Sequence, residues 1–292
     1  MQMFDNGHVP ESLLLIIAAT TLRILDPDDP RPHRWADECR RKVLLDAFLP
    51  PTQTTLQTFI LLQRYEWHRG SHMSAWITSA IAVRLTHALQ LNLELPRKSG
   101  NVHPVSLTVR EMRRRTLWAC FVMESLMESG RHPFSGLDLS SIETNLPGDE
   151  HSFQLGIGNE LPGSWTDSAS EPSTILNLPW FQGRPDIPAY LVRLAILRLL
   201  ILQYTAPYHP RNADRMPQTL PWLAEGPFYQ FEAELTRWSA DFPDSLRLST
   251  DNLYRRQPDL LGFVTFHYWT PSECDGHRQY DRNIATTSAF GT

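Results

Sequence analysis

Cysteine and positive charge are both scarce in this sequence of 292 residues. Its three cysteines, Cys39, Cys120 and Cys274, lie far apart and are odd in number. This excludes a disulfide framework and a cysteine-built zinc site, and favours a reducing intracellular compartment. Lys and Arg total 27 against 32 Asp and Glu, a net charge of −5, whereas nucleic-acid-binding domains usually carry a basic excess. We therefore expect neither a large DNA-binding face nor a resident cofactor in these residues.

Long hydrophobic runs and strand patterns are missing as well. The longest apolar run, residues 13–25, contains Arg23 and is shorter than the roughly 20 residues that cross a bilayer. The first ten residues contain no Lys or Arg, unlike the positively charged start of a secretory signal. No useful length of alternating apolar and polar residues indicates a strand. The sequence thus predicts an all-α protein with no membrane association.

Apolar residues recur at helical spacing in seven stretches. We predict that the first forms a buried helix, with Ser12 available to cap its start. In the fourth, an apolar stripe interrupted by Arg84 is expected to face the core. That stripe comprises Ile77, Ile81, Ala88 and Leu91. The predicted helices span about residues 13–25, 35–48, 54–68, 73–91, 109–128, 189–203 and 228–240.

The region from about residue 130 to about residue 188 has no helical period. Gly, Pro, Ser, Asp and Asn recur there, which predicts long loops and short turns. The expected architecture is an irregular multi-helix bundle with these long Pro- and Gly-rich loops. Residues 260–269 are apolar and fit a helix or a strand equally. Residues 270–292 contain only Ile284 and Phe290 as large apolar side chains, so we expect a disordered polar tail after a domain of residues 1–269.

No motif for catalysis or metal binding is found. The sequence contains no HExxH helix, no G-x-S-x-G elbow and no complete glycine-rich phosphate loop. His68 and His72 stand four residues apart, but Gly70 separates them and no nearby carboxylate completes a metal site. We therefore name no catalytic residue and no metal ligand.

Two charged residues interrupt apolar helix faces, Arg84 in the fourth predicted helix and Glu124 in the fifth. A buried charge is tolerable only when it is paired, so one hypothesis is that the two pair with each other. The alternative is that Arg84 faces a pocket and binds an anionic effector.

A basic cluster lies near the start of the fifth predicted helix. Its four arginines, Arg110, Arg113, Arg114 and Arg115, oppose the helix dipole there and need acidic compensation. Glu111 is adjacent. We expect a solvated role or ion pairs between helices, rather than phosphate contact, because no aromatic stacking platform accompanies the cluster.

Two blocks of sequence resemble the fungal-specific transcription factor domain, the middle homology region of zinc binuclear-cluster regulators. The first block, residues 54–94, contains Trp76, Arg84 and Leu91 at positions that resemble the family pattern. The second resembles the family's E-x-R-R-R-x-W segment, G-R-P turn and terminal L-P. It contains Glu111, Arg113, Arg114, Arg115, Trp118, Glu124, Gly130, Arg131, Pro133, Leu146 and Pro147. The resemblance extends more loosely over about residues 13–269.

This resemblance implies a nuclear regulatory domain that controls transcription by RNA polymerase II. It further implies partners in the transcription machinery, a homodimer or heterodimer, and a small-molecule effector. The family's six-cysteine zinc cluster, basic linker and coiled coil have no counterpart in the sequence, so zinc and DNA contact are expected only through an upstream module, and the chain is expected to be truncated or an incomplete gene model. Two alternatives stay open: a modulator without DNA binding that pairs with an intact regulator, and a helical enzyme acting on metabolites through the loops of 130–188.

Overall fold

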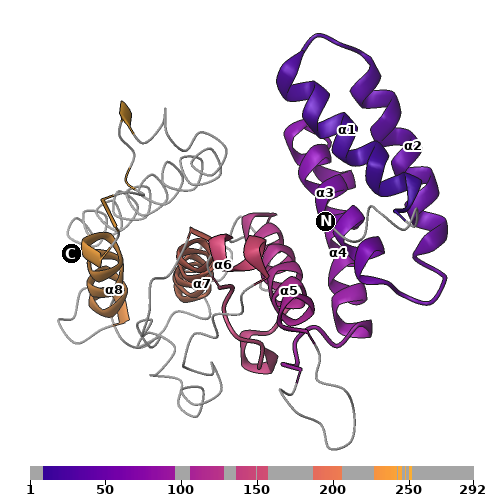
Figure 1. The fold of residues 1–292 in the computed structure, drawn as a ribbon. Helices are drawn as coiled ribbons and strands as arrows, with labels where there is room; N and C mark the ends of the chain where they lie inside the picture. The colour runs from indigo at the N-terminus through magenta and orange to yellow at the C-terminus, as the bar shows by residue number, and fades with distance from the viewer. Residues whose placement is uncertain are drawn as a thin grey trace, which may run out of the picture.

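The computed structural model describes residues 9–95, 106–127, 136–148, 150–156, 187–205 and 227–241, together with 243, 244, 247, 250 and 251. Within these ranges the protein is helical and contains no strand, which confirms the all-α prediction (Figure 1). The elements are α1 (Glu11–Leu25), α2 (Arg31–Asp46), α3 (Gln53–His68), α4 (His72–Ala88), α5 (Leu107–Met127), the 3-10 helix η1 (Leu139–Ser141), α6 (Glu150–Leu155), α7 (Ile187–Thr205) and α8 (Pro227–Asp241).

Helix α3 is the centre of the first half of the fold. It packs against α1, α2, α4 and α5, and its core side chains include the fully buried Leu56 and Leu62. The Thr52 side chain caps its start by accepting a hydrogen bond from the Thr55 amide. Gly70 follows its end with φ of 84°, a conformation that glycine adopts without steric cost. Both boundaries therefore follow from local sequence.

A buried carboxylate joins three of these helices. Glu66 of α3 is fully buried and accepts hydrogen bonds from Arg40 Nε of α2 at 2.6 Å and from Thr78 Oγ1 of α4 at 2.8 Å. Burial, together with the charge of Glu66, raises the pKa of the neighbouring Cys39 thiol to about 12. The network fixes the rotation of each helix, because a buried charge without its partners is costly.

Helices α1 and α2 expose apolar residues that the sequence predicts to be buried. In α1 only one face, with Ile16 and Ala19, is covered, whereas Ile17 on another face is exposed, so the predicted burial of the whole helix is wrong. Ser12 lies inside α1 and makes no capping bond. Phe48, the last residue of the second predicted helix, lies beyond the end of α2 and is 91% exposed. A helix that is apolar on most sides does not reveal which side is covered.

The predicted core stripe of the fourth helix is also wrong. Helix α4 buries Ala75, Ala82 and Val83 instead, while Ile77 is 52% exposed. Small side chains let α4 approach α3 closely, and this close contact places the larger Ile77 on the outer side. Leu91 is fully buried as expected, but it lies beyond the end of α4.

The second half of the fold is built on α5. Helix α7 packs on α5, and α8 packs on α7 (Figure 1), with a buried pair between Arg193 and Glu234 at 3.0 Å. The short helices η1 and α6 lie in the stretch predicted to be loops and turns, and α6 is the element that the sequence did not predict. Residues 260–269, the tail 270–292 and Cys274 lie outside the described residues. None of the described helices combines the length and apolar character of a membrane span.

Replacement of Arg40 by Ala is expected to lower the free energy of unfolding by about 3 kcal/mol, because it leaves the buried Glu66 carboxylate without its cation. Arg41→Ala is the matched control, since Arg41 pairs with Glu38 at the surface and should cost less than about 1 kcal/mol. Urea unfolding followed by circular dichroism measures both values. Equal losses in the two variants would show that the buried network does not hold α2 on α3.

Candidate functional site

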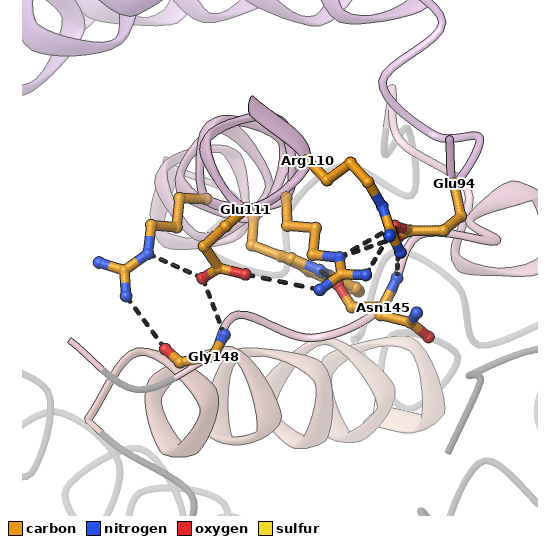
Figure 2. A network of polar contacts seen from close by, with 8 residues as sticks. Glu94, Arg110, Glu111, Asn145 and Gly148 are labelled. Atoms are coloured by element: carbon orange, nitrogen blue, oxygen red, sulfur yellow. Dashed lines mark hydrogen bonds and ion pairs between the residues drawn. The ribbon is translucent and has the colours of Figure 1, made fainter. Parts of the chain in front are cut away.

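Residues 136–148, here called the strap, return along α5 after the helix ends, as Figure 2 shows in part. The strap is tied first to the segment that follows α4. The Thr144 hydroxyl donates to the Leu91 carbonyl at 2.6 Å, and the Glu143 amide donates to the Asn92 carbonyl at 2.8 Å. These bonds satisfy the Leu91 and Asn92 carbonyls and the Glu143 amide, which have no partner within a helix or a strand.

Glu94 is the central acceptor of the charged network in Figure 2. Arg114 of α5 donates to both of its carboxylate oxygens, from Nε at 3.0 and 3.1 Å and from Nη2 at 2.7 Å. Arg110 approaches the same carboxylate at 3.5 Å, and the Asn145 backbone amide donates to it at 3.1 Å. The fork geometry is the strong form of an arginine–carboxylate contact, and it joins the end of α4, α5 and the strap.

Glu111 and Arg115 hold the end of the strap between them. The Glu111 carboxylate accepts from the Gly148 amide at 2.8 Å, and Arg115 donates to the Gly148 carbonyl at 3.0 Å. Arg115 also bonds Glu111 at 2.8 Å, pairs with Glu150 of α6 and lies over the Phe153 ring, 4.2 Å from its centroid. Burial alone would lower the pKa of Arg115, but the hydrogen bonds that it donates to Glu150 and Glu111 outweigh burial and raise that pKa.

Arg113 serves a different purpose from its neighbours. Its guanidinium donates to the carbonyls of Leu89 and Gln90 at 3.2 and 2.8 Å, which are left without helical partners where α4 ends. Burial lowers the pKa of Arg113. The contacts above place the other arginines of the cluster in ion pairs, one of the two expected roles, whereas the capping by Arg113 was not predicted.

Trp118 anchors the middle of the strap. Its ring is almost fully buried, and its indole Nε1–H donates to the Asn145 carbonyl at 2.8 Å. Asn145 is therefore held by its carbonyl on Trp118 and by its amide on Glu94. Leu146, which is partly buried, packs against the core, and Pro147 is buried. The described motif residues of the second block, apart from Arg113, thus meet around one strap.

The hypothesis of an Arg84–Glu124 pair is wrong. Glu124 is buried and accepts from the Gly136 amide at 2.6 Å, while Arg84 is exposed on the outer side of α4. Burial raises the pKa of Glu124, and hydrogen bonds from the Gly136 and Leu137 amides and the charge of His87 oppose this rise. Glu124 therefore holds the start of the strap rather than a second helix.

Two of the predicted residues, Trp76 and Arg84, are not brought to the strap. Trp76, like Arg84, lies on the exposed side of α4, and 55% of it is accessible. Gly130, Arg131 and Pro133 lie outside the described residues.

The acidic side chains around the strap pair with arginines and with backbone amides. No group of three or more His, Cys, Asp or Glu side chains in the described ranges is placed to hold a metal. Cys39 and Cys120 are buried in separate places, and burial raises the pKa of each thiol to about 12.

The family model for the fungal specific transcription factor domain matches residues 4–178, more than half of the chain. The chain belongs to this family. This match bears out the resemblance carried by the two sequence blocks.

Curated relatives are fungal transcription regulators. The Zn(2)-C6 fungal-type transcription factor FTF1c of Fusarium oxysporum f. sp. lycopersici is 26% identical over 87% of this chain and 28% of its own length. Two uncharacterized transcriptional regulatory proteins of Schizosaccharomyces pombe are 25% and 24% identical over 86% and 85% of this chain, and over 26% and 38% of their own lengths. The chain thus spans less than two fifths of each of these relatives. No solved structure matches it.

Sequence reasoning found Glu111 but missed the other acidic partners, Glu94 and Glu150, and the backbone partners of the network. Glu94 follows the apolar run that ends the first block, and Glu150 opens α6. Glu94 is an acidic residue among apolar neighbours. The same pattern singled out Glu124 and could have singled out Glu94. The backbone groups of Asn145 and Gly148 carry no signal of this kind, because every residue has them.

Glu94→Gln is expected to lower the free energy of unfolding by about 2 kcal/mol, because it weakens charge-assisted bonds to two buried arginines while keeping the side-chain shape. Glu143→Gln, on the exposed side of the strap, is the control and should change stability by less than about 0.5 kcal/mol. Thermal and urea unfolding of both variants measure this difference. A Glu94 variant as stable as the control would contradict the proposed role of the carboxylate.

Glu124→Gln is expected to gain stability relative to the native chain as pH rises. A carboxyl whose pKa is raised by folding contributes its stability at low pH and loses it as pH rises through the folded pKa. Glutamine carries no charge, so the variant does not lose this stability. Each unit of difference between the folded and unfolded pKa of Glu124 corresponds to about 1.4 kcal/mol. Urea unfolding of both proteins between about pH 5 and pH 8 measures the difference between their free energies of unfolding. A difference that becomes smaller as pH rises would contradict the effect of burial on the pKa of Glu124.

Proposed function

We propose that this chain is the regulatory domain of a fungal-type transcription regulator, and that its role is regulatory rather than enzymatic. Family membership over residues 4–178 supports this role, as do relatives whose names describe them as transcription factors or transcriptional regulatory proteins. Nuclear location and partners in the transcription machinery belong to the same proposal.

The observation that carries the proposal is the use made of the arginine cluster on α5. Arg110 and Arg114 contact Glu94, Arg113 caps α4, and Arg115 contacts Glu111, Glu150 and Gly148. Positive charge that is neutralised inside the protein attracts few phosphates. We infer that the cluster builds a rigid helical scaffold and that another part of the regulator reads DNA.

A tethering experiment tests this function. The chain fused to a heterologous DNA-binding domain should change transcription of a reporter that carries the matching DNA site, by activation or repression. The same chain without the fused domain should leave the reporter unchanged, because its arginine cluster on α5 is engaged internally. Glu94→Gln in the fusion should reduce the effect, whereas Glu143→Gln should preserve it. A fusion that is expressed and folded but has no effect would contradict the proposal.

A further inference from the structure

The outer side of α4 carries a stripe of side chains with symmetric spacing. Met73, Trp76, Ala80, Arg84 and His87 follow one another at intervals of three, four, four and three residues, which places them on one side of the helix. His87, at the end of the stripe, is half-buried, and its Nε2 lies 3.0 Å from the Gly136 carbonyl oxygen of the strap. Met73 is 70% and Trp76 is 55% exposed, and Ala80 and Arg84 are also exposed. The opposite side of α4 packs on α3, so this stripe is the outer surface of the bundle at that point.

Arg84 is the one residue of the stripe with a permanent charge. It forms no hydrogen bond or ion pair with any residue that the structure describes, in contrast to the four arginines of α5. Tryptophan and arginine are the residues enriched at the energetic centres of protein interfaces. Trp76 and Arg84 are both exposed, and each lies one turn from Ala80, on opposite sides of it. The surface around Ala80 therefore has the composition of a docking surface.

We propose that a second copy of this chain docks on this stripe, with the two α4 helices antiparallel and a two-fold axis passing beside Ala80. In such an isologous contact each residue meets the one at the mirrored position of the other copy. Ala80 then faces its own equivalent, and the small side chain allows the helices to approach closely. Arg84 lies over the partner's Trp76, and Trp76 receives the partner's Arg84, which gives two cation–π contacts.

Charge favours this arrangement over the parallel one. A parallel pair would place Arg84 against its own equivalent, and two like charges in contact repel. The antiparallel pair separates the two guanidinium groups by about 12 Å along the helix, since eight residues rise by 1.5 Å each. The stripe contains no Asp or Glu, so no acidic residue in it competes with the indole for Arg84.

One helix face buries less than the roughly 800 Å² per partner of a standard interface. We therefore expect a weak dimer, with a dissociation constant in the micromolar range. This inference stands apart from the role in transcription, since it requires only the surface of α4.

Disulfide trapping tests the position of the two-fold axis. Cys274 is replaced by Ser in the full chain, and Ala80→Cys is compared with Ala88→Cys, an exposed alanine of the same helix. Under oxidised glutathione the Ala80→Cys chain should form a covalent dimer, because equivalent residues on the axis lie within disulfide reach. The Ala88→Cys chain should stay monomeric, since its equivalents lie about 24 Å apart along the axis. Equal trapping at both positions, or none at residue 80, would overturn the proposal.

Sedimentation velocity tests the chemistry of the contact. Trp76→Ala and Arg84→Ala should each weaken the dimer at least tenfold, and the double variant should weaken it little further, because both remove the same contact. Ile17→Glu, on the exposed apolar side of α1, is the control and should leave the dimer intact. A chain that stays monomeric at several hundred micromolar, or a dimer broken by Ile17→Glu and not by Trp76→Ala, would contradict docking through α4. Far-ultraviolet circular dichroism verifies that each surface variant is folded.

Discussion

The fork between Arg114 and Glu94 is the contact on which the second half of the described fold depends. The Glu94 carboxylate, just beyond α4, receives two arginines of α5 and the backbone amide of Asn145. Without it Arg114 would keep only its longer contact with Glu111 at 3.6 Å, and the strap would lose a backbone partner. Because unpaired buried charges are far more costly than exposed ones, this carboxylate fixes the register between α4, α5 and the strap together.

The positive charge of the arginine cluster is therefore directed inward. Arg113 closes α4, Arg115 holds Gly148 and Glu150, and Trp118 holds Asn145. Glu111, Arg115, Trp118 and Glu124 of α5 all bind backbone groups of the strap. Arg84 on the outer side of α4 has no such partner among the described residues, and its surface is one of the described faces open to association.

Sequence reasoning predicted the helices better than the faces that they bury. Pro, Gly and polar capping residues mark helix ends, so the predicted third and fifth helices end within one residue of α3 and α5. The faces of α1 and α4 were misassigned because both helices are apolar on more than one side. The Arg84–Glu124 hypothesis failed for a related reason: spacing within each helix does not give the rotation of one helix against another. Glu94 escaped notice because its arginine partners lie 16 and 20 residues away, beyond any local pattern.

Hydrogen exchange at the strap tests the central claim most directly. The amides of Asn145 and Gly148 lie in a segment without helix or strand, and each donates to a carboxylate, Glu94 or Glu111. We predict that both amides exchange at least a hundredfold more slowly than in an unstructured peptide, and that Glu94→Gln removes most of the protection at Asn145. Exchange of both amides at the peptide rate in the native chain would show that the strap is not fastened by these carboxylates.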